Sequence, residues 1–265
     1  GELVDAARWC QPEVANVVAN LPVISPNGDG IDDEATVSFA LSKKAFATFF
    51  LTNERGDYYL LYAPQQKEGL QAYLFDGHDV NKKLLPDGKY SFHIQTWDRA
   101  GNLTEATGPI SIEQGGEPRL EIMDAKFSPT SIPLGGKVQV RITVKNVGDA
   151  IIRSDPADGV GPAPGTPYTT DQSFASWQSE DKTPLYYERP GTFRVGVSWT
   201  NAPPPPVPVR WSLGKDLAPG EETTVTGEVQ VLQRTRELYF SAWVVQEGIG
   251  FPGGARAQTV VKISY

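Results

Sequence analysis

The sequence predicts an all-β protein built from two tandem β-sandwich domains. The chain has 265 residues, which is more than a single domain usually contains. It holds 26 glycines and 22 prolines, and only 21% of its residues are charged, a balance typical of turn-rich β structure. Short segments of β-branched and aromatic residues recur along the chain between Gly, Pro, Asn and Asp turns, at the spacing of a sandwich.

The first predicted domain comprises residues 22–115, and residues 1–21 precede it as a short N-terminal extension. The extension carries apolar side chains at Val14, Val17 and Val18. This pattern fits either a leader helix or an extended strand that docks elsewhere. The strands expected within the domain are residues 36–41, 46–53, 57–63, 70–77, 88–98 and 107–114.

The second predicted domain comprises residues 116–265. It follows the segment EQGGEPRLEI, whose two glycines and proline between apolar runs are typical of a short interdomain joint. In KVQVRITVKNV, apolar residues from Val138 to Val144 alternate with polar ones, which predicts a strand with one buried and one solvated face. The other strands expected here are residues 119–129, 191–200, 208–214, 222–232, 237–248 and 257–265.

A long insertion, residues 155–190, interrupts the second domain. It is rich in Gly, Pro, Ser and Asp but contains Phe174, Trp177, Tyr186 and Tyr187. Long segments without strand signals tend to be functional, and the aromatic residues predict that this one packs on the domain. Four consecutive prolines, residues 203–206, predict a stiff spacer or edge blocker at a hairpin tip.

Composition and charge exclude several function classes. The net charge is −8 and no cluster of Lys and Arg appears, so nucleic acid is not an expected partner. No apolar run approaches the ~20 residues of a membrane helix, so no membrane span is expected. An acidic surface fits a secreted protein that attracts divalent cations. We therefore expect an extracellular or cell-surface protein whose signal peptide is absent from this chain.

The sequence offers little material for catalysis. A Ser/His/Asp or Cys/His arrangement would have to use His78 or His93, and the strand-like context of His93 predicts a structural role. Cys10 is the only cysteine, so an intramolecular disulfide is impossible and a zinc site has too few ligands. No pair of carboxylates stands out for sugar hydrolysis. We expect the protein not to be an enzyme.

The segment SPNGDGIDDE, residues 25–34, places four carboxylates and an asparagine in ten positions. Like charges within ~5 Å raise each other's pKa and destabilise a fold unless they are compensated. Ca²⁺ takes about six to eight oxygen ligands, and the glycines permit a tight loop that turns the oxygens of Asn27, Asp29, Ile31 (its carbonyl) and Asp33 toward one centre. There are two alternatives to a bound calcium ion: the turn holds no ion at all, or a distant arginine folds over it and compensates its charge.

Two longer stretches strengthen the calcium interpretation. ISPNGDGIDDEATVSFAL and LFDGHDVNKKLLPDGKYSFHIQTWDRAGN together resemble the bacterial Ig-like module related to the flagellar hook-capping protein and to gliding-motility C-terminal domains. The resemblance implies an Ig-like sandwich and a calcium site at Asn27, Asp29 and Asp33, with Asp98 contributing from a neighbouring loop. Asp32 departs from the pattern, where the family commonly has Asn.

The second half carries a different resemblance. IPLGGKVQVRITVKNVGDA and DLAPGEETTVTGEVQV are similar to the cell-adhesion-related bacterial Ig-like domain. The long insertion departs from that pattern and leaves the binding surface unassigned. Both resemblances imply export, and neither implies catalysis.

Together these features predict a non-catalytic structural or adhesion protein of a bacterial cell surface. An extended N-terminal segment can add to an open sheet of another subunit, so residues 13–24 are the candidate donor for a filament. The expected partners are further copies of the chain or other cell-surface components. The alternative is a carbohydrate-binding accessory module of a secreted enzyme, with a polysaccharide partner. That alternative uses the aromatic residues of the insertion, from Phe174 to Tyr187, as a platform on which sugars stack. Four tryptophans also suggest sugar binding, namely Trp177, Trp199, Trp211 and Trp243, but the last three lie in strand-like text where a core position is common.

Overall fold

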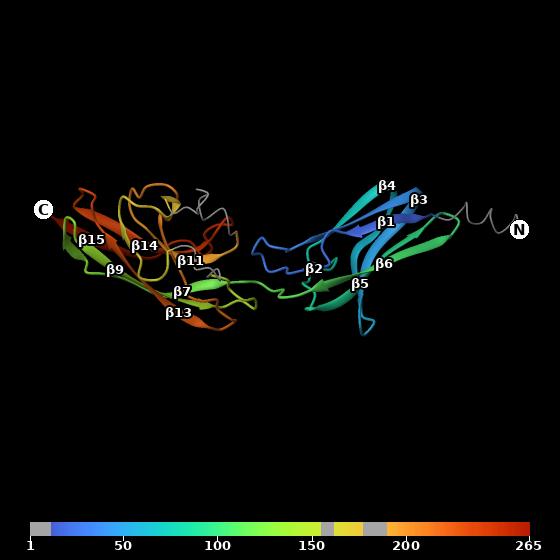
Figure 1. Cartoon of the computed structure of the whole chain (residues 1–265), viewed down its shortest axis with the longest axis horizontal. Helices are drawn as coiled ribbons and strands as arrows, with labels where there is room; N and C mark the ends of the chain where they lie inside the picture. The colour runs from blue at the N-terminus through green and yellow to red at the C-terminus, as the bar shows by residue number, and fades with distance from the viewer. Residues whose placement is uncertain (1–11, 155–161, 177–189) are drawn as a thin grey trace, which may run out of the picture. The chain divides into compact units, whose positions relative to one another are not determined.

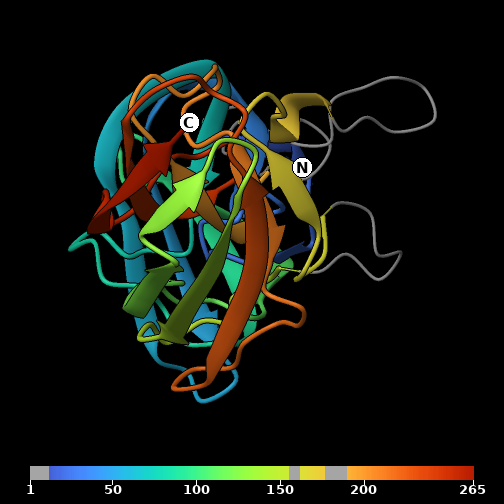
Figure 2. The same ribbon diagram turned by 90° about the vertical axis from the view of Figure 1, so that its left-hand side faces the viewer.

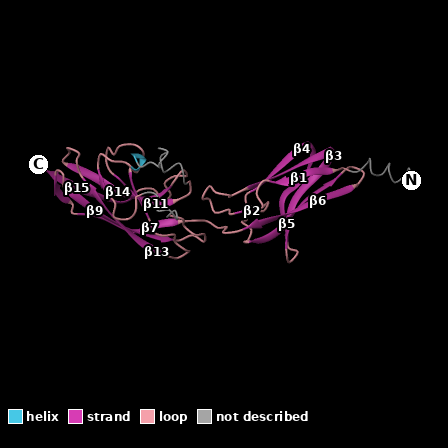
Figure 3. Cartoon of the chain, in the orientation of Figure 1, coloured by secondary structure: helices cyan, strands magenta, loops and turns pink. Residues whose placement is uncertain are grey.

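The structure is a computed structural model that describes residues 12–154, 162–176 and 190–265. Nearly all of its regular structure is β-strand, and one short 3₁₀ turn, η1 (Phe174–Ser176), is the helix that Figure 3 shows. In the described part of the chain no helix has the length and apolar character needed to cross a bilayer. The predictions made for Cys10, Trp177, Tyr186 and Tyr187 fall outside the described residues.

The chain divides into two compact units, whose strands Figure 1 labels. Of the described residues, 12–27 and 31–116 form the first unit, and 28–30 together with those from 117 onward form the second. Each unit has its own hydrophobic core. The prediction of an all-β protein of sandwich domains is confirmed.

The first unit is one six-stranded sheet that curls over its own core. The strand order is β1-β3-β5-β6-β2, and β4 pairs with β3. All pairs are antiparallel except that of β2 with β6. The strands are β1 (Val14–Ala19), β2 (Val23–Ile24), β3 (Ala35–Asn53), β4 (Tyr58–Phe75), β5 (Gly88–Trp97) and β6 (Leu103–Ile112).

The curl arises because β3 serves both layers of the sandwich. Its first part, up to Leu41, pairs with β1, and its second part, from Phe46, pairs with β5. The register with β4 shifts between Leu41 and Ala45. Such a bulge bends a strand, which lets it pass from one layer to the other. The sequence predicted two separate strands here because the polar residues 42–44 resemble a turn.

The N-terminal extension belongs to this sheet, which corrects two predictions. β1 pairs antiparallel with β3, so residues 14–19 are not a leader helix. β2 continues the sheet by pairing parallel with β6. Val14 and Val17 pack against the core, whereas Val18 is 60% exposed. The first unit therefore includes residues 12–21, and residues 13–24 are not an unmatched donor segment.

Aromatic residues fill the core of the first unit. The rings of Phe49 and Tyr73 stack with centroids 5.2 Å apart, and Phe92 meets Phe49 edge-on at 6.2 Å. Gly108 on β6 faces Phe92, where a Cβ would lie 2.4 Å from the ring. The core thus forms where the two halves of the curled sheet face each other.

The second unit is a sandwich of two separate sheets, which Figure 2 shows in green to red. One sheet has the order β10-β13-β9-β7, and the other has the order β12-β11-β14-β15-β8. Its strands are β7 (Leu120–Ser128), β8 (Ser131–Pro133), β9 (Lys137–Asn146), β10 (Pro167–Thr169), β11 (Phe193–Ser198), β12 (Val209–Ser212), β13 (Glu222–Gln230), β14 (Glu237–Gln246) and β15 (Arg256–Ser264).

The alternation predicted for β9 is confirmed, because its apolar residues from Val138 to Val144 are all buried. They share the core with Trp211, whose indole Nε1 donates a hydrogen bond to the carbonyl of Thr166 at 2.7 Å. Gly227 lies against this indole, and a Cβ there would come within 2.2 Å of the ring. Only glycine leaves room for the tryptophan at this point of β13.

Those parts of the insertion that the structure describes pack on the second unit, as predicted. β10 adds to the edge of one sheet by pairing parallel with β13. Phe174 is completely buried. Pro203–206 lie in the loop that connects β11 to β12, which are antiparallel neighbours, so the tract is at a hairpin tip.

Candidate functional site

The acidic turn between β2 and β3 closes on itself through hydrogen bonds. The backbone N–H of Ser25 donates to the carbonyl of Asp32 at 2.7 Å, and its hydroxyl donates to the carbonyl of Ile31 at 3.0 Å. The N–H of Asn27 donates to Oδ1 of Asp33 at 3.0 Å. Gly28 has φ of 72°, in the left-handed region that glycine enters without steric cost. The glycine pattern therefore serves the turn itself.

The four carboxylates of this turn have different surroundings. Asp32 and Glu34 are exposed, and Asp33 accepts the hydrogen bond from the turn's own backbone. Asp29 is only 6% exposed, and its Oδ2 lies 3.7 Å from Nε of Arg153. A distant arginine, one of the alternatives to calcium, is thus present beside the one deeply buried carboxylate of the turn.

Asp98 holds a different turn. Its carboxylate accepts hydrogen bonds from the backbone N–H groups of Ala100 and Asn102, from the side-chain amide of Asn102, and from Nζ of Lys43 at 2.7 Å. These contacts with Lys43 and Asn102 lower the pKa of Asp98 well below its usual range. The carboxylate is therefore already engaged by a cation and by its own turn.

Strand register separates Asp98 from the acidic turn. Ile24, next to the turn, pairs with Ile112, which in turn pairs with Gly88 at the start of β5. Asp98 follows the other end of that strand, Trp97. The ten residues of β5 span roughly 30 Å at about 3.3 Å per residue. The prediction that Asp98 joins the calcium site is wrong.

The remaining predicted ligands lie in a single turn. Asn27, Asp29, the carbonyl of Ile31 and Asp33 are all oxygen donors of the kind that Ca²⁺ accepts. In the described residues, however, no group of three or more His, Cys, Asp or Glu side chains is placed to hold a metal. Calcium binding by this turn stays a prediction.

Other glycine- and aspartate-containing segments of the first unit build turns next to the acidic one. Gly77 of the FDG segment faces the ring of Pro26, to which a Cβ would come within 2.6 Å. The carboxylate of Asp87 accepts hydrogen bonds from the backbone N–H groups of Gln114 and Gly115. These residues fix the chain on either side of the acidic turn.

Tyr90 closes the PDGKY turn. Its hydroxyl donates to the carbonyl of Pro86 at 2.6 Å, and burial raises its pKa to about 12. A tyrosine near the start of a strand that bonds back to the chain a few residues upstream recurs in Ig-like sandwiches.

The two histidines have local contacts. The His93 ring stacks on Phe50 with centroids 4.7 Å apart, and its ring nitrogens contact the hydroxyl of Thr52 at 2.9 Å and the carboxylate of Glu105 at 2.5 Å. His78 contacts the backbone carbonyl of Asp76 through Nδ1. The environment of His93 matches the structural role that its sequence context predicted.

The second unit contains a buried ionic cluster that the sequence analysis did not predict. Glu247 is 2% exposed, and its carboxylate accepts a hydrogen bond from Nη1 of Arg210 at 2.5 Å. Nε of Arg194, also 2% exposed, lies 3.4 Å from the other carboxylate oxygen. Burial raises the pKa of Glu247, and the two guanidinium groups oppose that shift. Removing one partner of such a cluster leaves a buried charge uncompensated.

Phe174 lies beneath both guanidinium groups. The guanidinium carbons of Arg194 and Arg210 are 5.0 and 5.3 Å from the centre of its ring. This buried position excludes Phe174 as a sugar-stacking platform, and Trp199 and Trp211 are buried as well. The carbohydrate alternative loses three of the aromatic residues on which it depended.

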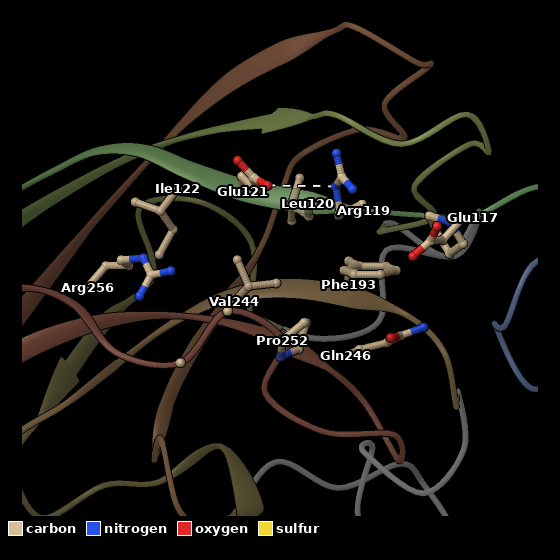
Figure 4. Close-up of a pocket in the computed structure, with 13 residues that line it drawn as sticks. Glu117, Arg119, Leu120, Glu121, Ile122, Phe193, Val244, Gln246, Pro252 and Arg256 are labelled. Carbon is tan, nitrogen blue, oxygen red and sulfur yellow. Dashed lines mark ion pairs between the residues drawn. The ribbon is translucent and has the colours of Figure 1, made fainter.

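A cleft opens between the two sheets of the second unit, with a volume of about 380 Å³. Figure 4 shows Phe193 and Val244 along its floor, with Ile122 opposite them and the guanidinium of Arg256 pointing into the space between Ile122 and Val244. Apolar walls with a few polar groups at the rim are typical of binding sites, and their volumes begin near roughly 300 Å³. We treat this cleft as a second candidate site.

No family model matches the chain, and no curated protein matches it. Solved structures with distant similarity include the FN1–FN3 domains of chicken CNTN1, with a TM-score of 0.34, 7% identity, and coverage of 96% of this chain and 69% of that one. Native α2-macroglobulin of E. coli has a TM-score of 0.29 and 11% identity, with coverage of 96% and 17%. The adhesin InvE of Yersinia pseudotuberculosis has a TM-score of 0.27 and 11% identity, with coverage of 96% and 60%.

These similarities carry no argument about function, and the chain spans less than a quarter of the α2-macroglobulin. The two family resemblances drawn from sequence motifs stay predictions. What the structure adds is the location of the polar groups: the acidic turn, the buried ionic cluster and the cleft.

The sequence gives little indication of the cleft or of the ionic cluster. Arg194 interrupts the apolar run FRVGV, where every residue is buried, and such an arginine implies a buried partner. Arg256 stands at the start of β15 after Gly253, Gly254 and Ala255, a segment typical of an ordinary turn. Neither position could be linked to its neighbours before the strand order was known.

Proposed function

We propose that the protein is a non-catalytic, extracellular structural or adhesion protein of a bacterial cell surface. The observation that carries this proposal is that both compact units are β-sandwiches with open edge strands. Within the described residues, β4 pairs only with β3, and β7 pairs only with β9. Open edges allow strand addition by other chains, a common mode of assembly and recognition.

The polar groups of the structure support a non-catalytic role. His93 stacks on Phe50, and Glu247 is committed to two arginines. A general base needs a reachable substrate proton, and these groups face the interior or neighbouring side chains instead.

We retain calcium as part of the proposal, with a smaller set of ligands. Asn27, Asp29, the carbonyl of Ile31 and Asp33 would hold the ion, and no ligand from the Asp98 turn takes part. When bound, the ion would neutralise the turn and stiffen it, because oxygen ligands from one short loop are drawn to a common centre.

Assembly through residues 13–24 is not part of the proposal. These residues include β1 and β2, which already pair with β3 and β6 of their own chain. Self-association, where it occurs, would use an edge that is open in the single chain.

Deleting the gene from cells that produce the protein tests the proposal. The deletion should reduce attachment of the cells to one another or to surfaces, and a plasmid copy should restore it. Attachment unchanged by the deletion, together with loss of a hydrolytic activity from the medium, would contradict a structural or adhesive role.

A further inference from the structure

The cleft of the second unit runs along the open edge of β7. Three consecutive residues of this strand, Leu120, Glu121 and Ile122, line it. Side chains alternate between the two faces of a strand, so a cavity on one face would be lined by every second residue. Contact with consecutive residues places the cleft at the strand's edge, where alternate backbone N–H and C=O groups point away from β9.

The opposite wall of the cleft is open because the pairing of β14 with β15 ends at Ala242 and Arg256. The two strands pair regularly from Glu237 to Phe240, and their register then shifts before Ala242 pairs with Arg256. Ala257 has φ of 51°, in the left-handed region, as expected where a strand bulges. Beyond Ala242, Val244 pairs with β11 on one side and borders the cleft.

Two arginines, Arg119 and Arg256, and two glutamates, Glu117 and Glu121, line the cleft. Arg256 forms no ion pair within the described chain, and the one hydrogen bond of its guanidinium group goes from Nη1 to the neighbouring carbonyl of Ala255 at 3.3 Å. The other arginine of the cleft, Arg119, lies 3.7 Å from Glu121 in an exposed pair. A carboxylate that reached Arg256 would therefore not have to displace an existing partner.

We propose that this cleft binds an extended peptide segment that carries an acidic residue. The peptide would add to β7 as a further strand through backbone hydrogen bonds. One apolar side chain would lie against Ile122 and Pro252, the partly exposed apolar residues that line the cleft. A carboxylate two positions away along the same face would pair with Arg256.

A displayed library of random octapeptides, selected against the full chain, tests this proposal. Enriched peptides should share an Asp or Glu two positions from a β-branched or aromatic residue. As synthetic peptides they should bind the wild type at least tenfold more tightly than the Arg256→Gln variant. Arg234→Gln changes an exposed arginine elsewhere on the same unit and should leave the affinity unchanged.

Backbone amide shifts separate strand addition from other modes of binding. The amides of Glu121, Ile122 and Met123 should shift on addition of an enriched peptide, because the new strand pairs with that edge. The proposal is overturned if selection enriches no peptide, or if binding is equal in Arg256→Gln. It is also overturned if 4-phenylbutyrate, a small apolar carboxylate, binds in the same Arg256-dependent way while no peptide shifts the β7 amides.

Discussion

At the scale of single residues, Asp98 shows how one carboxylate links a turn to the long strand β3. Lys43 lies in the bulged part of β3, and its ammonium group bonds Asp98 in the turn after β5. The pKa of Asp98 is lowered in the folded state. A carboxylate with a depressed folded pKa contributes stability above its unfolded pKa of about 3.9, and that stability is lost as the pH falls below it.

The Asp98→Asn variant should therefore melt at a lower temperature than the wild type at pH 7. The difference should shrink as the pH falls below about 4, because the carboxylate of the unfolded chain then takes up a proton while that of the folded protein, with its lowered pKa, stays ionised. Thermal melts followed by circular dichroism between about pH 2 and pH 7 would measure the difference. Asp32→Asn removes an exposed carboxylate as a control. A difference that stays constant across the range would contradict this role.

The acidic turn offers a second prediction. Chelation with EGTA should lower the melting temperature, and Asp29→Asn should remove most of that response because it removes a central ligand. Added Ca²⁺, but not added Na⁺ at the same ionic strength, should restore the melt. If chelation changes nothing while Arg153→Gln lowers the melting temperature, the arginine alone compensates Asp29 and the calcium proposal fails.

Sequence patterns at this scale predicted the turn but not its surroundings. Gly28 and its neighbours allow a tight loop, and the loop forms as expected. Arg153 could not be paired with Asp29 from sequence, because the two are far apart along the chain. Asp98 was wrongly placed in the calcium site because its sequence motif resembles that of the family. Only the strand register shows that Asp98 lies at the end of β5 far from the acidic turn.

At the scale of strands, β1 shows how a segment that precedes a predicted domain becomes part of it. Val14 and Val17 pack against the core of the first unit, and Val18 points outward. The apolar residues alone could not distinguish a helix from a strand, because the segment is short and its alternation is broken by a register shift.

Two neighbouring substitutions test the place of β1. Val17→Asp puts a charge against the core and should reduce the free energy of unfolding of the first unit by about 1–3 kcal/mol. Val18→Asp adds the same charge one residue later on the solvent side and should change it by less than about 0.5 kcal/mol. Urea melts of both variants would measure the difference. Equal effects would show that β1 does not hold this register.

Strand length was the weakest part of the prediction for the elements. β3 and β4 contain 19 and 18 residues, and each had been divided into two strands. Polar or glycine-containing stretches within them look like turns in the sequence. In the fold they are bulges and bends, which keep the backbone pairing while the strand changes layer.

At the scale of the whole molecule, the all-β fold was predictable because alternation and turn residues recur along the entire chain. The core of each unit followed from that alternation, as in β9. The proposed binding surfaces could not be predicted, because open edges and clefts lie between strands that are distant in sequence. The open edge of β7 and the isolated charge of Arg256 exist only once the sheet order is set.

The proposal that this is a surface protein is tested most directly by protease treatment of intact producing cells. Peptides released before lysis would be identified by mass spectrometry and compared with those from lysed cells. We predict that peptides from both units, including the loops before Tyr58 and after Gln246, are released from intact cells. Release of these peptides only after lysis would place the protein inside the cell and contradict the proposed function.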